Sequence, residues 1–275
     1  MSAADEKIRY EVDGDVAVIT IDRYDEARNA ISIPVGVELY RALRRFEADD
    51  SLAVAVLTGA GGVFCAGFDL KWYADARRGE AGVPEDAPAD SHSMGPTRIT
   101  LCKPVIAAVE GYAVAGGLEL ACWCDMRVAA RDAVFGVYCR RWGMPLADGG
   151  TVRLTRIVGQ GHALDMILTG RGVSGEEARS MGLAQRLSEP GQALAGALEL
   201  AHHIASFPQG AARCDRQSAL EQWSLPELDA VANEIRLAMA VYDNDPVAHH
   251  QGVAGFEAGV GRHGKLADGR ELKKL

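Results

Sequence analysis

Two segments of the 275-residue chain share one layout, and that layout limits what the chain can fold into. Each has a continuous apolar run, then a turn that contains glycine, and then the start of a helix: LAVAVLTGAGGVFCAGFDL (52–70) and KPVIAAVEGYAVAGGLEL (103–120). An unbroken apolar run is typical of a strand buried on both faces, as in a parallel sheet covered by helices. The sequence therefore predicts an α/β core.

The rest of the chain fits such a core. We expect strands at 16–22, 52–59, 103–111 and 126–130, and helices at 34–48, with Ser32 as N-cap, 115–123 and 148–159. Helical periodicity then dominates to about residue 250, in segments 160–169, 174–181, 190–206, 209–221 and 226–242. Residues 73–97 are rich in Ala, Gly, Pro and charge, and this composition predicts a loop that covers a site.

Composition narrows the classes of function. The net charge of −9 argues against nucleic-acid binding, which needs a concentrated basic surface. The polar, acidic start predicts no secretory signal, no apolar run is long enough to span a membrane, and we expect a cytoplasmic protein. The cysteines lack zinc-site spacing and are expected to be buried free thiols: Cys65, Cys102, Cys122, Cys124, Cys139 and Cys214.

The two glycine-containing turns suggest a chemistry. A helix N-terminus exposes unpaired N–H donors, and glycine lets a ligand approach the backbone closely. Two such turns side by side can aim two N–H groups at one oxygen and form an oxyanion hole. Glycine is also common in ordinary strand–helix turns, so this layout by itself leaves both readings open.

Three segments make the pattern specific: FCAGFDL (64–70), GYAVAGGLELACWCDMRVA (111–129) and RNAIS (28–32). In order and separation they resemble the signatures of the crotonase superfamily, of the enoyl-CoA hydratase/isomerase type, over about residues 8–260. The resemblance implies a spiral of ββα units in residues 1–200, which holds the acyl-CoA site, and a helical oligomerisation region in 201–275. It also implies a homotrimer or homohexamer that takes an acyl-CoA substrate.

The resemblance assigns roles by position. It implies that the oxyanion donors are the backbone N–H groups of Phe68 and Gly116, while the Phe68 side chain can simply be a core aromatic. For Arg28 and Lys71 the alternative is ordinary surface charge. The residues that the resemblance places against coenzyme A or the substrate are Arg28, Ala30, Ala66, Asp69, Leu70 and Lys71.

Glu119 matches the first catalytic glutamate of the hydratases, about one turn into the helix that starts at Gly116. One helical turn rises about 5.4 Å, so its carboxylate can stand near an oxygen held at the helix start and act as general base or acid. The alternative is a first-turn glutamate that merely complements the helix dipole.

The second catalytic glutamate of the hydratases is missing. The segment FGVYCRRWG (135–143) places Cys139 at that position. Cys139 is either a packed, inert thiol or a nucleophile whose pKa Arg140 and Arg141 lower. Asp148, in MPLADGGTVRL (144–154), offers a replacement carboxylate, because related enzymes that move double bonds or remove halogens use an aspartate in this region. Its alternative role is that of a helix N-cap.

We therefore predict an enoyl-CoA hydratase with Glu119 and Asp148 as catalytic carboxylates. The alternatives are an isomerase that shifts the double bond, another thioester reaction of the superfamily, and a non-catalytic acyl-CoA-binding subunit. Coenzyme A is part of the substrate, and no metal or redox cofactor is implied. His92 lies in the variable loop, from which it could reach a cleft, and is expected at the surface.

Overall fold

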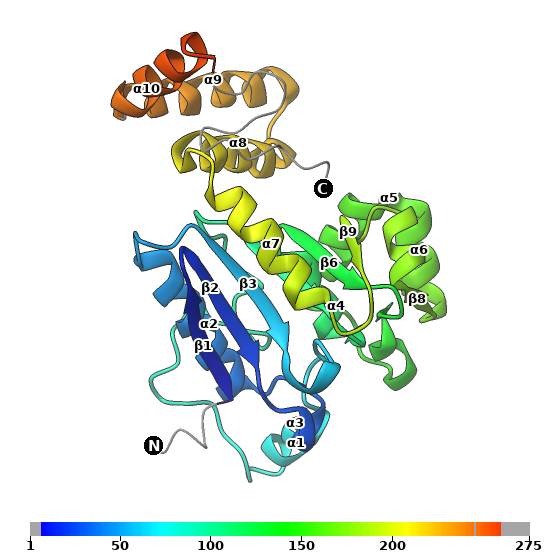
Figure 1. Cartoon of the computed structure of the whole chain (residues 1–275). Coiled ribbons are helices and arrows are strands. Elements are labelled where there is room, and N and C mark those ends of the chain that lie inside the picture. The colour runs from blue at the N-terminus through cyan, green and yellow to red at the C-terminus, as the bar shows by residue number, and fades with distance from the viewer. Residues whose placement is uncertain (1–6, 245, 260–275) are drawn as a thin grey trace. The chain divides into compact units, whose positions relative to one another are not determined.

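The computed structural model describes residues 7–244 and 246–259 and is built around a six-stranded sheet (Figure 1). Its strands lie in the order β1 (Ile8–Asp13), β2 (Val16–Ile21), β3 (Val54–Gly59), β4 (Val105–Val109), β6 (Met126–Ala130) and β9 (Arg186–Ser188). β1 is antiparallel to β2, and every other neighbouring pair is parallel. The strands expected at 16–22, 52–59, 103–111 and 126–130 are β2, β3, β4 and β6.

A second, smaller sheet contains β5 (Tyr112–Val114), β7 (Val134–Gly136) and β8 (Gly172–Ser174). β4 and β5 are followed by helix α4 (Gly116–Trp123), while β6 and β7 are followed by α5 (Gly150–Thr169). β5 runs parallel to β7, just as β4 runs parallel to β6. This repeat of two strands and a helix confirms the predicted α/β spiral of ββα units.

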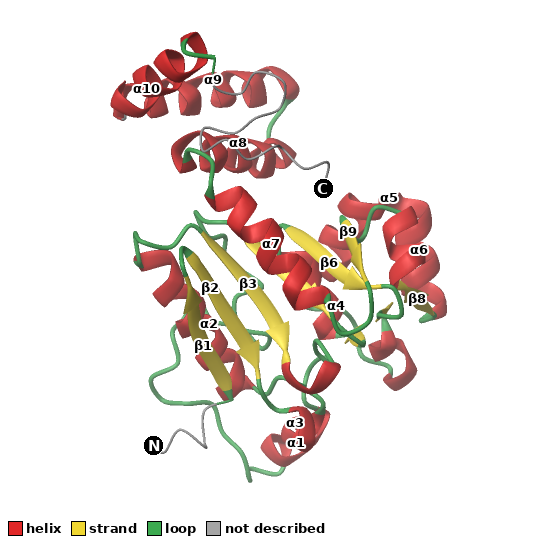
Figure 2. Cartoon of the chain, in the orientation of Figure 1, coloured by secondary structure: helices red, strands yellow, loops and turns green. Residues whose placement is uncertain are grey.

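The apolar runs are unbroken because helices cover both faces of the large sheet. Val54 and Val56 of β3 pack in one cluster with Ala197 and Leu200 of α7 (Ala193–Ala205), and α7 lies across that face in Figure 2. Leu57, which points to the opposite face, belongs to the other cluster, with residues of α2 (Ile33–Ala48) and α4. Successive strand residues point to opposite faces, so both must be apolar.

The remaining helices are short or lie late in the chain. Before β4 they are α1 (Tyr24–Ala27), the 3₁₀ turn η1 (Ala60–Gly62) and α3 (Leu70–Arg77). After β7 come η2 (Tyr138–Trp142), α6 (Gly175–Ser180), α8 (Gln209–Glu221), η3 (Gln222–Ser224), α9 (Glu227–Asn244) and α10 (Pro246–Glu257). Ser32 occupies the N-cap position of α2, as expected, but its side chain makes no capping hydrogen bond.

One expectation about local structure was wrong at its start. The loop expected at 73–97 begins inside α3, whose side chains include no buried residue, so the sequence carries no apolar period there. Instead Asp69 starts this helix by accepting hydrogen bonds from the N–H groups of Lys71 and Trp72. The helices expected at 148–159 and 160–169 are the two halves of α5, which is interrupted at Gly159, where φ 79° and ψ 159° are not helical.

The six cysteines are all free thiols, but they are not all buried. Cys65, Cys122 and Cys124 are buried, whereas Cys139 and Cys214 are half-buried and Cys102 is exposed. Cys102 is exposed because it lies in the bend before β4 rather than in the strand. The expectation of buried thiols was therefore right for three of the six positions.

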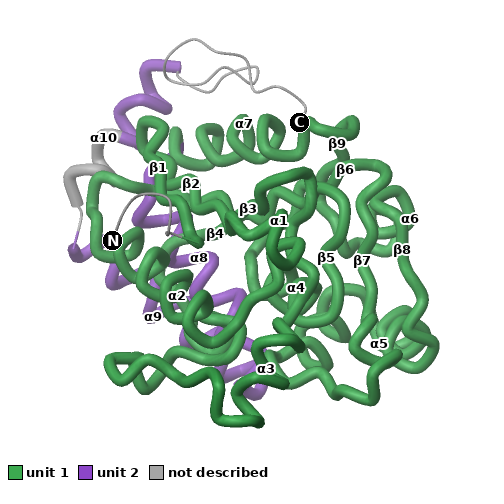
Figure 3. Tube along the Cα trace, turned by 90° about the horizontal axis from the view of Figure 1, so that it is seen from below, with its two compact units in different colours: residues 1–206 green, residues 207–275 purple. Residues whose placement is uncertain are grey.

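The chain divides into two compact units after Ser206 (Figure 3). The first contains both sheets and α1–α7, and the second contains α8–α10. The predicted oligomerisation region, 201–275, extends beyond the described residues at its end, and its role stays a prediction. Among the described helices, none combines the length and apolarity needed to cross a membrane.

Candidate active site

The two glycine-containing turns lie against each other. After β3 and η1 the chain runs beside β5, where the N–H of Cys65 donates to the carbonyl of Tyr112 (2.9 Å) and the N–H of Val114 donates to the carbonyl of Cys65 (3.1 Å). Asn29 holds the preceding turn, since its side-chain amide donates to the carbonyls of Ala60 (2.8 Å) and Val63 (2.6 Å). The segment 64–68 is thereby fixed next to the start of α4.

This approach requires glycine at two positions. A Cβ atom on Gly117 would lie 2.2 Å from the carbonyl oxygen of Cys65. A Cβ atom on Gly67, whose φ is +102°, would lie 3.0 Å from the nitrogen of Gly116. Both glycines therefore serve close backbone contact, which explains why the two turns contain them.

The N–H groups of Phe68 and Gly116 are available at this junction. Ile31 pairs with the residues on either side of Phe68: its N–H donates to Gly67 O (2.8 Å) and its carbonyl accepts from Asp69 N–H (2.9 Å). The N–H of Phe68 is left out of that pairing. Gly116 is the first residue of α4, so its N–H has no partner in the helix. Within the described residues neither group donates to a backbone acceptor.

The residue before Gly116 is strained. Ala115 has φ 53° and ψ −123°, a conformation that residues with a side chain rarely adopt. Such strain costs on the order of 1–3 kcal/mol and is concentrated at functional sites. Here the N–H of Ala115 is anchored to the carbonyl of Gly136 (2.8 Å), which fixes the first turn of α4 beside the cavity. No sequence motif marks this strained alanine.

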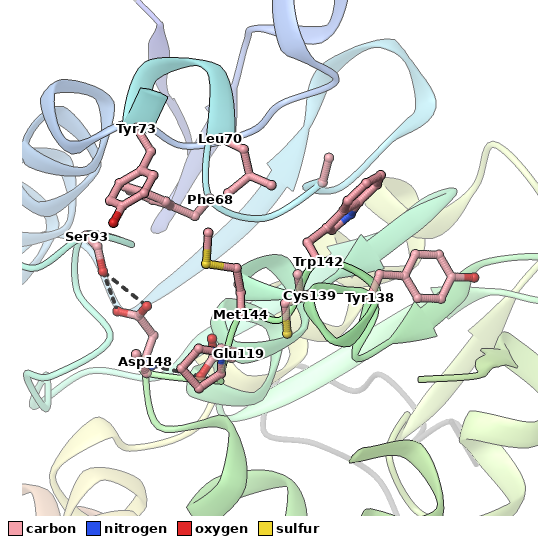
Figure 4. Close-up of a pocket in the computed structure, with 15 residues that line it drawn as sticks. Phe68, Leu70, Tyr73, Ser93, Glu119, Tyr138, Cys139, Trp142, Met144 and Asp148 are labelled. Carbon is pink, nitrogen blue, oxygen red and sulfur yellow. Dashed lines mark hydrogen bonds between the residues drawn. The ribbon is translucent and has the colours of Figure 1, made fainter. Parts of the chain in front are cut away.

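A cavity of about 320 Å³ opens at the junction (Figure 4). Phe68 and Gly116 both line it, and so do the predicted carboxylates Glu119 and Asp148. The cavity thus joins the four residues expected to form the oxyanion hole and the catalytic pair. The other lining residues are Ala66, Leu70, Tyr73, Ser93, Ala115, Tyr138, Cys139, Trp142, Met144, Pro145 and Ala147.

Glu119 is buried, with 3% of its surface exposed. Its Oε1 accepts hydrogen bonds from the N–H groups of Asp148 (2.8 Å) and Gly150 (2.9 Å). Burial raises the pKa of this carboxyl, the charge of Asp148 also raises it, and the two N–H donors oppose the increase. These contacts hold Glu119 across the turn before α5, so it does more than complement the dipole of α4.

Asp148 is also buried, and hydroxyl groups surround its carboxylate. Thr97 Oγ1 donates to Oδ1 (2.8 Å), and Ser93 Oγ lies 3.1 Å from both oxygens (Figure 4). The N-cap of α5 is Gly149 rather than Asp148, and no side chain caps this helix. The capping role considered for Asp148 is therefore wrong, because its carboxylate accepts hydrogen bonds from Ser93 and Thr97 instead.

Cys139 lines the cavity but is not activated. Burial raises the pKa of its thiol, and the negative charge of Glu119 raises it further, while Arg140 lowers it only weakly. The two arginines are engaged elsewhere: Arg140 Nε donates to Ile167 O (3.2 Å), and the guanidinium of Arg141 lies over the Tyr138 ring. The suggestion that they lower the pKa of Cys139 and make it a nucleophile is thus contradicted.

The expected cover loop supplies side chains that the sequence did not identify. Ser93 and Thr97 bind Asp148, and His92 lies next to them with Nδ1 3.6 Å from Asp148 Oδ1. The His92 side chain is 33% exposed, so the expectation of a plain surface histidine was wrong. No apolar period or motif marks this loop, so only its fold could place these side chains near Asp148.

The residues expected to contact coenzyme A divide into two groups. Ala66 and Leu70 line the cavity, while Arg28, Ala30, Asp69 and Lys71 are not among its lining residues. Asp69 serves the fold, because it caps α3 and pairs with Arg23 (3.2 Å). The carbonyl of Ala30 accepts from the same arginine (2.6 Å), and Arg28 ends α1 with φ 50°.

Comparison with known proteins identifies the family of this chain. The model of the enoyl-CoA hydratase/isomerase family matches residues 11–258. The chain belongs to this family. A relative from Mycobacterium tuberculosis, enoyl-CoA hydratase EchA19, is 36% identical over 84% of this chain and 87% of its own length. A probable enoyl-CoA hydratase from Rhizobium meliloti is 34% identical over 92% of this chain and 95% of its own.

Solved structures of the family have the same fold. The crystal structure of enoyl-CoA hydratase EchA1 from Mycobacterium marinum matches with a TM-score of 0.83 and 35% identity. The match covers 92% of this chain and 96% of that one. The family fold thus extends over nearly the whole chain.

The contact between Gly117 and Cys65 predicts a strong effect of a single methyl group. We expect Gly117→Ala to lower the free energy of unfolding by about 1–3 kcal/mol or more, because the new Cβ overlaps a carbonyl oxygen. Gly161→Ala is the control, since nothing lies within 4 Å of a Cβ at that helical position. Urea denaturation of both variants measures the difference. Equal stability of the two would contradict the close approach.

Proposed function

We propose that this protein is an enoyl-CoA hydratase, which adds water across the double bond of a 2-enoyl-CoA thioester. One observation carries the proposal: two unpaired backbone N–H groups, of Phe68 and Gly116, line the same cavity as two buried carboxylates. The N–H pair can stabilise the negative charge that develops on the thioester oxygen. The carboxylates can carry a proton and orient the attacking water. The names of the relatives, enoyl-CoA hydratases, support the same reaction.

The first step uses the N–H pair. The thioester oxygen accepts hydrogen bonds from Phe68 and Gly116 and gains negative charge as water adds to C3. In a comparable oxyanion hole, loss of one donor costs about 2.7–4 kcal/mol of transition-state stabilisation. The strained Ala115 holds one of these donors in place before the substrate arrives, so less reorganisation is needed during the reaction.

The two carboxylates have different tasks. Glu119 takes a proton from the attacking water, whose oxygen bonds to C3, and returns a proton to C2, so the carboxylate is restored after each turnover. Asp148 accepts hydrogen bonds from Ser93 and Thr97, and in this form it acts as an acceptor that orients the attacking water. In this scheme Asp148 replaces the glutamate absent at Cys139. The reaction needs no metal ion or redox cofactor, because it is acid–base chemistry.

Supporting evidence for the assembly comes from the second unit. Side chains of η3 and α9 expose large apolar surfaces, among them Trp223, Leu228 and Ile235. Exposed apolar surface of this kind is typical of a contact with another chain. We propose that α8–α10 join copies of this chain into a homotrimer or homohexamer, and that the enzyme works in the cytoplasm.

The reaction is tested with 2-enoyl- and 3-enoyl-CoA thioesters in deuterated water, with products analysed by mass spectrometry. We expect one water to add to the 2-enoyl thioesters. Glu119→Gln should abolish turnover while binding of the thioester persists, because only the proton carrier is lost. Deuterium uptake without addition would indicate an isomerase, and free coenzyme A a thioester hydrolase. Binding without any reaction would leave an acyl-CoA-binding subunit.

The replacement of the second glutamate by Asp148 predicts opposite outcomes at two positions. Asp148→Asn should lower kcat by about 10²-fold, the scale of loss when an attacking group is no longer held in position. Cys139→Ser should leave kcat within a few-fold, because the neutral thiol takes no part. Steady-state hydration rates for both variants measure this. A large loss in Cys139→Ser together with an active Asp148→Asn would reverse the assignment.

The burial of Glu119 predicts the acidic limb of the pH–rate profile. Its pKa is raised, so the carboxyl stays protonated, and inactive as a base, up to a higher pH than an exposed glutamate. As the pH falls, kcat/KM should therefore decline at a pH above the ordinary glutamate pKa of 4.5. Hydration rates measured from neutral to acidic pH, with circular dichroism as the control for folding, give the midpoint. A midpoint below 4.5 would contradict a desolvated base.

A further inference from the structure

Beyond the carboxylates, the cavity wall is mainly apolar and aromatic. The aromatic residues Phe68, Tyr73 and Trp142 line it, together with the flexible thioether of Met144 (Figure 4). The cavity volume is about 320 Å³, within the range of about 300–1,000 Å³ that is typical of ligand pockets.

Part of this aromatic wall faces solvent. Trp142 of η2 is 70% exposed, and Tyr73 and Leu70 of α3 are 42% and 39% exposed. Single exposed apolar side chains are common, but these three line one cavity, and they come from two separate elements. Apolar surface gathered at a cavity is typical of a ligand-binding site. An apolar group bound there would cover it.

Two rings of the wall, those of Phe68 and Tyr73, have aromatic partners. The ring of Phe68 meets Trp72 and Tyr73 edge to face, with ring centres 6.0 and 6.3 Å apart. Ring faces and edges prefer to meet other rings in such geometries, and rigid walls lose little entropy on binding.

Charge limits the acyl group further. The described residues that line the cavity include no lysine or arginine, while Glu119 and Asp148 are both acidic. A carboxylate on the acyl chain would be repelled by Glu119 and Asp148, and it would find no lysine or arginine among the described residues that line the cavity. The acyl group that fits is therefore electrically neutral.

We propose that the natural substrate of this enzyme is a neutral 2-enoyl-CoA whose acyl chain carries a ring beyond the double bond, and that Trp142 and Tyr73 select that ring. The proposal rests on the hydratase function proposed above. The ring packs against Trp142, Tyr73 and Met144, while the double bond lies at Glu119 and Asp148. A straight chain of equal carbon number makes fewer contacts with these aromatic faces.

The test compares two thioesters with the same number of acyl carbons: 3-cyclohexylprop-2-enoyl-CoA and non-2-enoyl-CoA. Hydration is followed through the loss of enoyl absorbance. We expect kcat/KM to favour the ring substrate by about tenfold or more, the scale on which apolar pockets discriminate. Trp142→Ala should remove most of this preference, mainly through the rate with the ring substrate, and Trp142→Phe should restore part of it.

The control is Leu168→Ala, which removes an apolar side chain that is 72% exposed on α5 and does not line the cavity. Its substrate preference should equal that of the wild type. If the wild type hydrates the straight chain as fast as the ring substrate or faster, the inference is overturned while the hydratase function stands. An unchanged preference in Trp142→Ala would also overturn it. Hydration of neither thioester would overturn both proposals.

Discussion

The two backbone hydrogen bonds of Cys65 with β5 place the segment after β3 against the first turn of α4. The rest of the site depends on this contact. It brings the N–H of Phe68 to the same cavity as the N–H of Gly116, although Phe68 follows β3 of the large sheet and Gly116 follows β5 of the small one. Because a carbonyl oxygen occupies the place where a Cβ of Gly117 would be, the contact exists only with glycine there.

A second contact connects that junction to the two buried carboxylates. Glu119 projects from α4 and accepts hydrogen bonds from Asp148 and Gly150, the residues that lead into α5. One carboxylate thereby fixes the backbone position of the other. A Cβ on Gly150 would lie 2.7 Å from Cγ of Glu119, so this approach also depends on glycine. The burial that raises the pKa of Glu119 is a consequence of the same packing.

Much of this arrangement was predictable from local pattern. The buried strands β2, β3, β4 and β6 show as apolar runs, since a strand covered on both faces has no polar side. The family signatures around Phe68, Gly116 and Glu119 marked residues that do line one cavity. The edge strand β1 was missed, because only one of its six residues is buried, and so were the short strands β5, β7, β8 and β9. Strands of three residues carry too few side chains to show a period, and α3 buries none.

The sequence by itself determined the α/β class, the family and the residues around the N–H pair, because these depend on apolar periodicity and on glycines at set spacing. Only the tertiary structure decided what Asp148 does: its carboxylate meets Thr97 and Ser93, from a loop that has no motif, and Gly149 starts the helix instead. It also decided that Cys139 is a neutral thiol, since the pKa of that group depends on burial and on the nearby charge of Glu119. Contacts between segments distant in sequence set such properties, and local pattern does not encode them.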